Sequence, residues 1–270
     1  MSGLTTVMIM GGLDFLGSHL ARFLSKKYGG YRIVIVDSYG TIGCPIDVND
    51  CVVECVKDFN DELLHTLIST YRPEIIIDLS KAFTKSSLDL KSFHLFLDSL
   101  KIFGLRTLHL VPEQEHFSIL DHHFPVLFKI SNIYGPDHDD PINDMVCRAA
   151  VSDFVLIPDD GTVVRDWLYI DDCCSALSCL VDSGSHNKFY NIGSSEEIMD
   201  RDLAQMILGK YELPLSMIDY DESSLSGCSS RKFDIADIKR LGWAPTIGID
   251  RGVSSVIRLY SRHNNGGQNA

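Results

Sequence analysis

Residues 7–20 read VMIMGGLDFLGSHL, and the rest of the chain is organised around them. An apolar run is followed by a glycine turn and then by apolar residues at helical spacing, which predicts a strand, a tight turn and a helix. Gly11 and Gly17 permit the sharp turn and close packing of the helix on the strand. Because the free N–H groups and the dipole of a helix N-terminus favour anions, this turn predicts a pyrophosphate site.

The next apolar run, residues 31–37, ends in the acid Asp37. In dinucleotide-binding folds a carboxylate about twenty residues past the turn hydrogen-bonds the adenosine ribose. Position 14 departs from the pattern, because a dinucleotide site usually has glycine there and this chain has Asp14. We expect its bulk and negative charge to weaken binding. The alternative interpretation is an α/β turn that binds nothing.

The composition is that of an ordinary globular protein, with 270 residues, 45% hydrophobic and 23% charged. The net charge of −13 argues against nucleic acid and anionic membranes as partners, since both require clustered Lys and Arg. The eight cysteines include no Cys-x-x-Cys pair, so neither a disulfide framework nor a zinc site is expected. No apolar run approaches the ~20 residues that span a bilayer, and we expect a cytoplasmic location.

Strands and helices alternate through the first half of the chain. Apolar runs predict further strands at residues 51–56, 74–79, 105–111 and 125–130. Helical spacing predicts helices at 61–69 and 87–103. This alternation indicates an α/β fold with a doubly wound parallel sheet. In the second half, strand-like segments mix with helices expected at 142–151, 171–182, 200–209 and 234–240.

The segment Tyr134-Gly135-Pro136 marks the predicted domain boundary. We expect a dinucleotide-binding Rossmann domain over residues 1–135, a smaller C-terminal α/β substrate-binding domain over 136–262 and a disordered tail over 263–270. An alternative places the helix at 171–182 on the first domain.

Seven separated motifs occur in a characteristic order. They read GGLDFLGSH at 11–19, DFND at 58–61, DLS at 78–80, NIYGP at 132–136, RDWLYIDD at 165–172, FYNIG at 189–193 and LGWAP at 241–245. Together they resemble the extended short-chain dehydrogenase/reductase family, specifically its NAD-dependent nucleotide-sugar epimerases, 4,6-dehydratases and decarboxylases. The likeness covers nearly the whole chain.

This resemblance implies NAD as cofactor and a nucleotide sugar as substrate. The residues it assigns to the NAD site are Gly11, Asp14, Phe15, Leu16, Gly17, Asp37, Asp58, Phe59, Leu79 and Ser80. Arg165 and Arg231 match arginines that clamp the substrate diphosphate, and Asn132 matches a residue lining the same groove. Guanidinium groups suit such oxygens through paired, charge-assisted hydrogen bonds. The alternatives are an Arg165 salt bridge with Asp166 or Asp171, and an Arg231 at a solvated helix start.

The catalytic pair of the family is missing. Its chemistry needs Tyr-x-x-x-Lys, in which the lysine lowers the pKa of the phenol, and none of the ten tyrosines has lysine four residues later. Residues 112–124 alone separate two predicted parallel strands, a length that barely permits a crossover. Glu115, in a remnant of a dehydratase-like Asp-Glu, and His116 are weak catalytic candidates. The aspartates and histidines at 121–123 and 138–140 lack the i, i+4 spacing of known metal ligands, so no metal is assigned.

The shortened crossover also affects the surface. In relatives, the deleted helix packs with the preceding long helix at a dimer interface, so the helix predicted at 87–103 would lack its neighbour and could serve a homo-oligomer or a protein partner. Our leading hypothesis is a catalytically impaired epimerase/dehydratase-like protein that binds dinucleotide or nucleotide sugar in a regulatory or structural role. The alternatives are an active enzyme with a displaced base and a scaffold subunit of a larger assembly.

Overall fold

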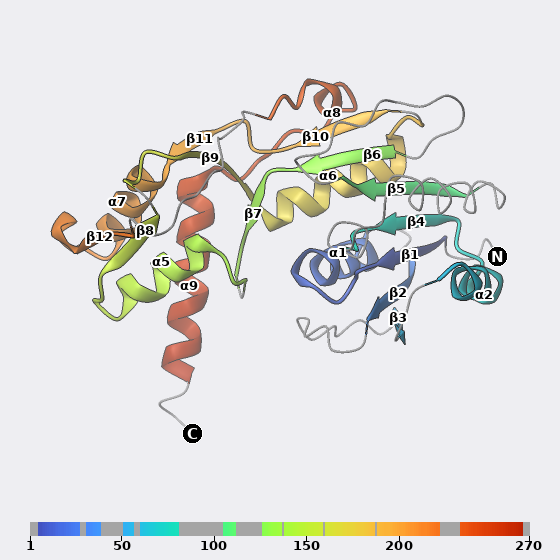
Figure 1. Cartoon of the computed structure of the whole chain (residues 1–270), viewed down its shortest axis with the longest axis horizontal. Helices are drawn as coiled ribbons and strands as arrows, with labels where there is room; N and C mark the ends of the chain where they lie inside the picture. Colours follow the sequence, from blue (N-terminus) through green and yellow to red (C-terminus); the bar gives the residue numbers. More distant parts are fainter. Residues whose placement is uncertain are drawn as a thin grey trace. The chain divides into compact units, whose positions relative to one another are not determined.

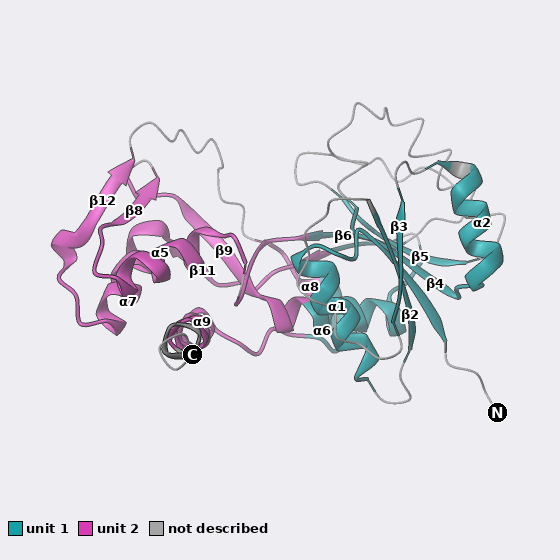
Figure 2. Ribbon diagram, turned by 90° about the horizontal axis from the view of Figure 1, so that it is seen from below, with its two compact units in different colours: residues 1–129, 174–190, 237–243 teal, residues 130–173, 191–236, 244–270 magenta. Residues whose placement is uncertain are grey.

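The computed structural model of the chain is shown in Figure 1. It describes residues 5–27, 31–38, 51–56, 60–80, 105–111, 126–136, 138–158, 160–186, 188–221 and 233–266. The helix predicted at 87–103, and with it the proposed partner surface, lies outside these residues. The chain forms two compact units (Figure 2): unit 1 comprises residues 1–129, 174–190 and 237–243, and unit 2 comprises 130–173, 191–236 and 244–270. The domain limits expected from the sequence stay a prediction.

A seven-stranded sheet, built mainly from unit 1, confirms the predicted Rossmann-like α/β fold. Its strands are β1 (Thr6–Met10), β2 (Arg32–Ser38), β3 (Cys51–Val56), β4 (Ile75–Asp78), β5 (Arg106–Leu110), β6 (Val126–Ile130) and β10 (Phe189–Ile192), in the order β10-β6-β5-β4-β1-β2-β3. The pairs from β3 through β6 are parallel. Strands β2 and β3 lie on one side of β1, and the strands from β4 onward lie on its other side, as in a doubly wound sheet.

The core of unit 1 follows from fully apolar strands, which suit a sheet covered on both faces. All five residues of β1 are buried, and one side packs against α2 (Asp61–Tyr71). The helix α1 (Phe15–Ser25) buries Leu16, Leu20 and Leu24. The Asn60 side chain caps α2 by accepting a hydrogen bond from the Leu63 N–H at 2.9 Å, which satisfies one of the free N–H groups at the helix start.

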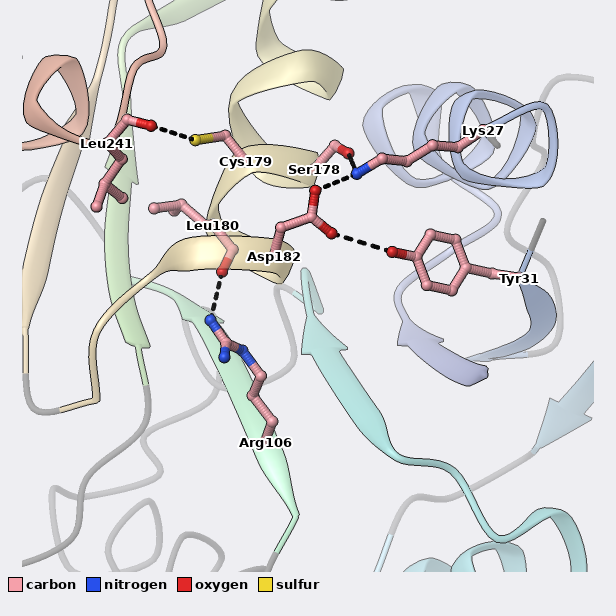
Figure 3. A network of polar contacts seen from close by, with 8 residues as sticks. All are labelled: Lys27, Tyr31, Arg106, Ser178, Cys179, Leu180, Asp182 and Leu241. Atoms are coloured by element: carbon pink, nitrogen blue, oxygen red, sulfur yellow. Dashed lines mark hydrogen bonds and ion pairs between the residues drawn. The ribbon is translucent and has the colours of Figure 1, made fainter. Parts of the chain in front are cut away.

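The C-terminal part of α6 (Ile170–Ser183) is fixed within unit 1 by polar contacts (Figure 3). Lys27 donates to Ser178 at 2.7 Å and forms an ion pair with Asp182. Arg106 donates to the carbonyl oxygens of Leu180 and Gly184, at 2.8 and 2.6 Å. The Leu180 carbonyl also accepts from the Gly184 N–H at 2.9 Å, so the guanidinium adds further hydrogen bonds at the carbonyls where the helix ends. The short helix α8 (Ala236–Arg240) also belongs mainly to unit 1.

Unit 2 contains two small sheets. The first has the order β11-β9-β7, with β7 (Asn132–Tyr134) parallel and β11 (Glu197–Met199) antiparallel to β9 (Val164–Tyr169). The second pairs β8 (Val155–Pro158) with β12 (Ile218–Asp221) in parallel. The remaining elements of this unit are α5 (Pro141–Ala150), α7 (Asp200–Lys210), η1 (Leu215–Met217) and α9 (Ile249–Gly266).

The expected helices at 142–151, 171–182 and 200–209 correspond to α5, α6 and α7 within a residue or two at each end. The region expected at 234–240 is helical only over α8. α9 was not predicted, and it extends through Gly266 into the segment expected to be a tail. No described helix is long and apolar enough to cross a membrane.

Candidate functional site

The turn between β1 and α1 is built so that two glycines cannot be replaced without strain. Gly11 has φ +72°, and a Cβ atom added to it would lie 2.8 Å from the N and Cα atoms of Ser80. A Cβ atom on Gly17 would lie 2.4 Å from Cα of Gly12. Contacts under 3 Å with backbone atoms cannot be relieved by a side-chain movement. Both glycines therefore serve the close packing that the sequence predicted.

Asp14 is the N-cap residue of α1. Its backbone is extended, and its carboxylate accepts a hydrogen bond from the Gly17 N–H at 3.1 Å. The side chain thus places its own negative charge at the positive end of the helix, where an anionic ligand would otherwise be favoured. A pyrophosphate bound at this turn would be close to that carboxylate and would be repelled by it.

Asp37 lies beside the same turn, near the end of β2. Its Oδ2 atom accepts a hydrogen bond from the Leu13 N–H at 2.8 Å, so the acid is held against the loop that precedes α1. Phe15 and Leu16 form the first turn of α1; Leu16 is buried and Phe15 packs against His19 with ring centroids 4.6 Å apart.

Leu79 and Ser80 follow β4 on the opposite side of the turn. Leu79 is buried, and its N–H donates to the Met10 carbonyl at 2.9 Å. The Ser80 N–H and hydroxyl both donate to Oδ1 of Asp78, at 3.0 and 2.7 Å. Oδ2 of Asp78 lies 3.2 Å from Nδ1 of the buried His109 on β5. This contact joins residues 31 positions apart and leaves no local pattern in the sequence.

In unit 2, Arg165 on β9 is held by Asp200, the first residue of α7. Its Nε atom lies 3.0 and 3.1 Å from the two carboxylate oxygens, and the side chains are 16% and 3% exposed. The expected alternative, a surface salt bridge with Asp166 or Asp171, is therefore wrong. The antiparallel pairing of β9 with β11 explains the difference, because Ile198 lies opposite Arg165 and α7 begins two residues later.

Asp166 has a structural role instead. Its carboxylate, on a residue 2% exposed, accepts hydrogen bonds from the Ser194 N–H and hydroxyl, both at 2.8 Å, and from the Ser195 N–H at 3.1 Å. Its backbone carbonyl accepts a hydrogen bond from the side chain of the exposed Asn132 at 3.2 Å. Asn132 and Arg165, from two different motifs, thus lie on neighbouring strands, β7 and β9.

Tyr134 belongs to the NIYGP motif at 132–136 and is fully buried. Burial raises its pKa, as do the nearby Tyr169 and Asp172, so the phenol stays protonated. Its ring contacts those of Trp167 and Tyr169 edge to face. Its hydroxyl lies only 1.8 Å from where a Cβ atom on Gly252 of α9 would be. Tyr134 is therefore a packing residue in the centre of unit 2.

His138 and Asp140 are among the loop residues considered in the sequence as metal ligands. Nδ1 of His138 lies 3.0 Å from Oδ2 of Asp140, whose other oxygen caps α5 by accepting from the Asn143 N–H at 2.9 Å. In the described part of the chain, no group of three or more His, Cys, Asp or Glu side chains could hold a metal ion. Asp58, Phe59, Glu115, His116 and Arg231 lie outside the described residues.

Comparison with known proteins places these motifs in context. Residues 119–193 match the model of the NAD dependent epimerase/dehydratase family. The family resemblance is confirmed. The motifs of β7 and β9 and the start of β10 all lie inside the matched segment, whereas the β1–α1 turn precedes it.

Individual relatives agree with this family. The epimerase/dehydratase-like chain is 29% identical to a putative GDP-L-fucose synthase 2 of Oryza sativa subsp. japonica over 151 residues, which are 51% of this chain and 43% of that protein. It is 26% identical over 162 residues to a dTDP-glucose 4,6-dehydratase of Xanthomonas campestris pv. campestris, covering 54% and 46%. The chain thus spans about half the length of the curated relatives it matches.

Solved structures show the same fold over nearly the whole chain. A dTDP-glucose 4,6-dehydratase from Bacillus anthracis str. Ames, in complex with NAD, superposes with a TM-score of 0.81 at 18% identity, covering 97% of this chain and 98% of that one. A UDP-glucose 4-epimerase from Thermotoga maritima, with UDP-glucose, gives a TM-score of 0.78 at 18% identity, covering 96% and 100%.

Proposed function

We propose that this epimerase/dehydratase-like chain binds NAD weakly in unit 1 and a nucleotide sugar in unit 2, without the proton transfer that its relatives perform, and acts in a regulatory or structural role. The observation that carries the proposal is the β1–α1 turn, which keeps the tight backbone of a dinucleotide site while Asp14 caps the helix at the phosphate position.

The NAD part of the proposal rests on the fit between the turn and the cofactor. Gly11 and Gly17 keep the tight turn and close packing that bring the start of α1 to a pyrophosphate, and Asp37, held beside Leu13, would bind the adenosine ribose. NAD supplies hydride transfer when it is bound. Asp14 opposes the phosphate charge, and we infer that it lowers the affinity without removing the site.

The absence of proton transfer rests on the tyrosines. A phenol acts as a base near neutral pH only if its environment lowers its pKa, as a neighbouring lysine does in the family. No tyrosine in the sequence has lysine four residues later. Wherever the described residues show a clear shift, the environment raises the pKa instead, as for Tyr31, Tyr71, Tyr134, Tyr169 and Tyr211.

The nucleotide-sugar part rests on Arg165 and Asn132. Asp200 holds the guanidinium by accepting hydrogen bonds from Nε of Arg165. Within the described part of the chain, the other side-chain nitrogens of Arg165 form no hydrogen bond. This arrangement orients the side chain and leaves its terminal amino groups for diphosphate oxygens. The exposed Asn132 on the adjacent strand β7 supplies a further polar group.

Calorimetric titration of the whole chain with NAD, and separately with UDP-glucose and dTDP-glucose, tests the proposal. We expect weak NAD binding and sugar-nucleotide binding that Arg165→Lys reduces about tenfold, because lysine keeps the charge near Asp200 but loses the planar fork. The control Arg201→Lys, on an exposed arginine of α7, should bind like the parent chain. Binding of neither ligand would leave only the scaffold role, and turnover of a sugar nucleotide would establish an active enzyme.

A further inference from the structure

The small parallel sheet of unit 2 has one covered and one uncovered side. Val155 and Ile157 of β8 are fully buried on the side where the strand packs against α5 and α7. Phe154, directly before the strand, and Leu156 point the opposite way because side chains alternate along a strand. They are 55% and 36% exposed. A large aromatic and a leucine side by side on a sheet face normally face another layer of structure.

Two more exposed apolar residues lie at the ends of the segments that lead into this sheet. Val151, in the turn between α5 and β8, is 66% exposed, and Leu215, in η1 directly before β12, is 57% exposed. Because β8 and β12 run parallel, with Val155 opposite Ile218, both lead-in segments approach the same end of the sheet. We name Phe154 and Leu156 the β8–β12 face, and Val151 and Leu215 lie in the segments at that end of the sheet.

The surroundings of the β8–β12 face are strongly acidic. Residues 149–160 and 211–221, which form the two strands and their lead-in segments, contain six acidic residues and no lysine or arginine. Asp219 lies opposite Leu156 in the β-ladder, and Asp153 precedes Phe154 with a side chain 59% exposed. A basic residue directly precedes each of the two segments, and both are already paired: Arg148 with Asp144, 3.8 Å from Asp153, and Lys210 with Asp250.

Acidic residues also outnumber basic residues over the whole of unit 2. Of the 37 acidic residues, 20 belong to unit 2, together with only nine of the 24 basic residues, so this unit carries −11 of the formal net charge of −13. A concentration of one sign of charge steers partners of the opposite sign and repels its own copies. A two-fold contact between two copies of this face would set acid against acid, which disfavours a homodimer here.

We propose that the β8–β12 face is a docking surface for a basic amphipathic segment of another protein, one that presents apolar side chains interspersed with Lys or Arg. The apolar residues would supply the buried centre of the contact, and the acidic residues around them the charge-complementary rim. This interaction goes beyond nucleotide binding and uses none of the residues assigned to it.

Fluorescence anisotropy with a labelled synthetic peptide tests the proposal on the whole chain. The probe is an amphipathic leucine–lysine helix of about 18 residues, and the comparison probe replaces every lysine with glutamate. We expect the lysine probe to bind at least about tenfold more tightly than the glutamate probe. The double variant Phe154→Ser/Leu156→Ser should weaken lysine-probe binding by about tenfold, and Asp153→Asn/Asp219→Asn should weaken it and flatten its salt dependence.

Val53→Ser supplies the matched control, since Val53 is an apolar residue 44% exposed on β3 of unit 1 and should leave binding unchanged. Each variant is compared by its thermal unfolding, so that loss of binding is separated from loss of fold. Equal binding of the two probes would overturn the proposal, as would lysine-probe binding that the Phe154/Leu156 variant leaves unchanged. Sedimentation showing a dimer that this variant dissociates would also overturn it, since the face would then serve a second copy.

Discussion

The β1–α1 turn and the segment from β9 into α6 both carry family signatures, but their acidic residues do different work. In β9 and α6, Asp166 and Asp172 are 2% and 3% exposed, and each accepts hydrogen bonds from a distant backbone segment. In the turn, Asp14 accepts a hydrogen bond from the N–H of Gly17, three residues away, and caps α1. The segment from β9 into α6 needs its carboxylates for the fold, whereas position 14 of the turn departs from the pattern of dinucleotide-binding turns.

A sequence motif of the family can therefore be kept because the fold needs it. Gly11 and Gly17 are required by backbone packing, and Asp166 by the N–H groups of Ser194 and Ser195, whether or not a substrate is turned over. The matching motifs are therefore evidence for the fold rather than for catalysis. Function has to be judged from position 14 and from the missing Tyr-x-x-x-Lys pair.

The largest effect should come from removing a buried carboxylate of the second segment. Asp172→Ala deletes the acceptor of the Thr246 N–H, the Thr246 hydroxyl and the Ile247 N–H, which lie at 2.8 to 2.9 Å. Because these donors lose their partner, we expect the free energy of unfolding to fall by about 3 kcal/mol, measured by urea denaturation. The neighbouring Asp171→Ala, at an exposed position, should change it by less than about 0.5 kcal/mol. Similar losses in both variants would contradict the architectural role.

A somewhat smaller effect is expected in the turn. Gly11→Ala forces a side chain into a left-handed backbone conformation and against the backbone of Ser80, so stability should fall by about 2 kcal/mol. Gly209→Ala is the matched control, because a Cβ atom there meets nothing within 4 Å and the residue lies in α7. That variant should gain about 0.5–1 kcal/mol. A Gly11→Ala chain as stable as the parent would show that the turn is not packed as described.

The smallest effect on stability is expected at position 14. Asp14→Asn keeps a good helix cap but removes the charge, so stability should stay within about 0.5 kcal/mol while NAD affinity rises about tenfold. Asp14→Gly should give at least the same gain in affinity with a slightly less stable α1. Calorimetry with NAD and thermal unfolding measure the two quantities. Unchanged affinity in both variants would show that the Asp14 carboxylate does not oppose the cofactor.

Local patterns in the sequence were enough to predict most of the described strands and helices of unit 1. The apolar runs at 7–10 and 31–37 correspond to β1 and β2, because strands buried on both faces are apolar without interruption. α9 was missed although Ile249, Val253, Val256 and Tyr260 recur at helical spacing, since Gly252 and many polar residues interrupt the pattern. Gly252 is there because Tyr134 occupies the space that a Cβ atom would need.

Contacts between distant residues could not be predicted in this way. The pairing of Arg165 with Asp200 depends on the antiparallel register of β9 and β11, and that of Asp172 with Thr246 joins residues 74 positions apart. The β1–α1 turn was predictable because its glycines and Asp14 lie in one short stretch of sequence. Hydrogen-bond partners brought together by the fold leave no such local pattern.

The most direct test incubates the purified chain with NAD and, in turn, UDP-glucose and dTDP-glucose, and follows the sugar nucleotide by chromatography and the cofactor by its absorbance. We predict that NAD binds, which a parallel titration would measure, and that neither the sugar nor the cofactor is converted. Catalytic turnover of a sugar nucleotide would contradict it, because a proton acceptor would then have to replace the missing tyrosine and lysine.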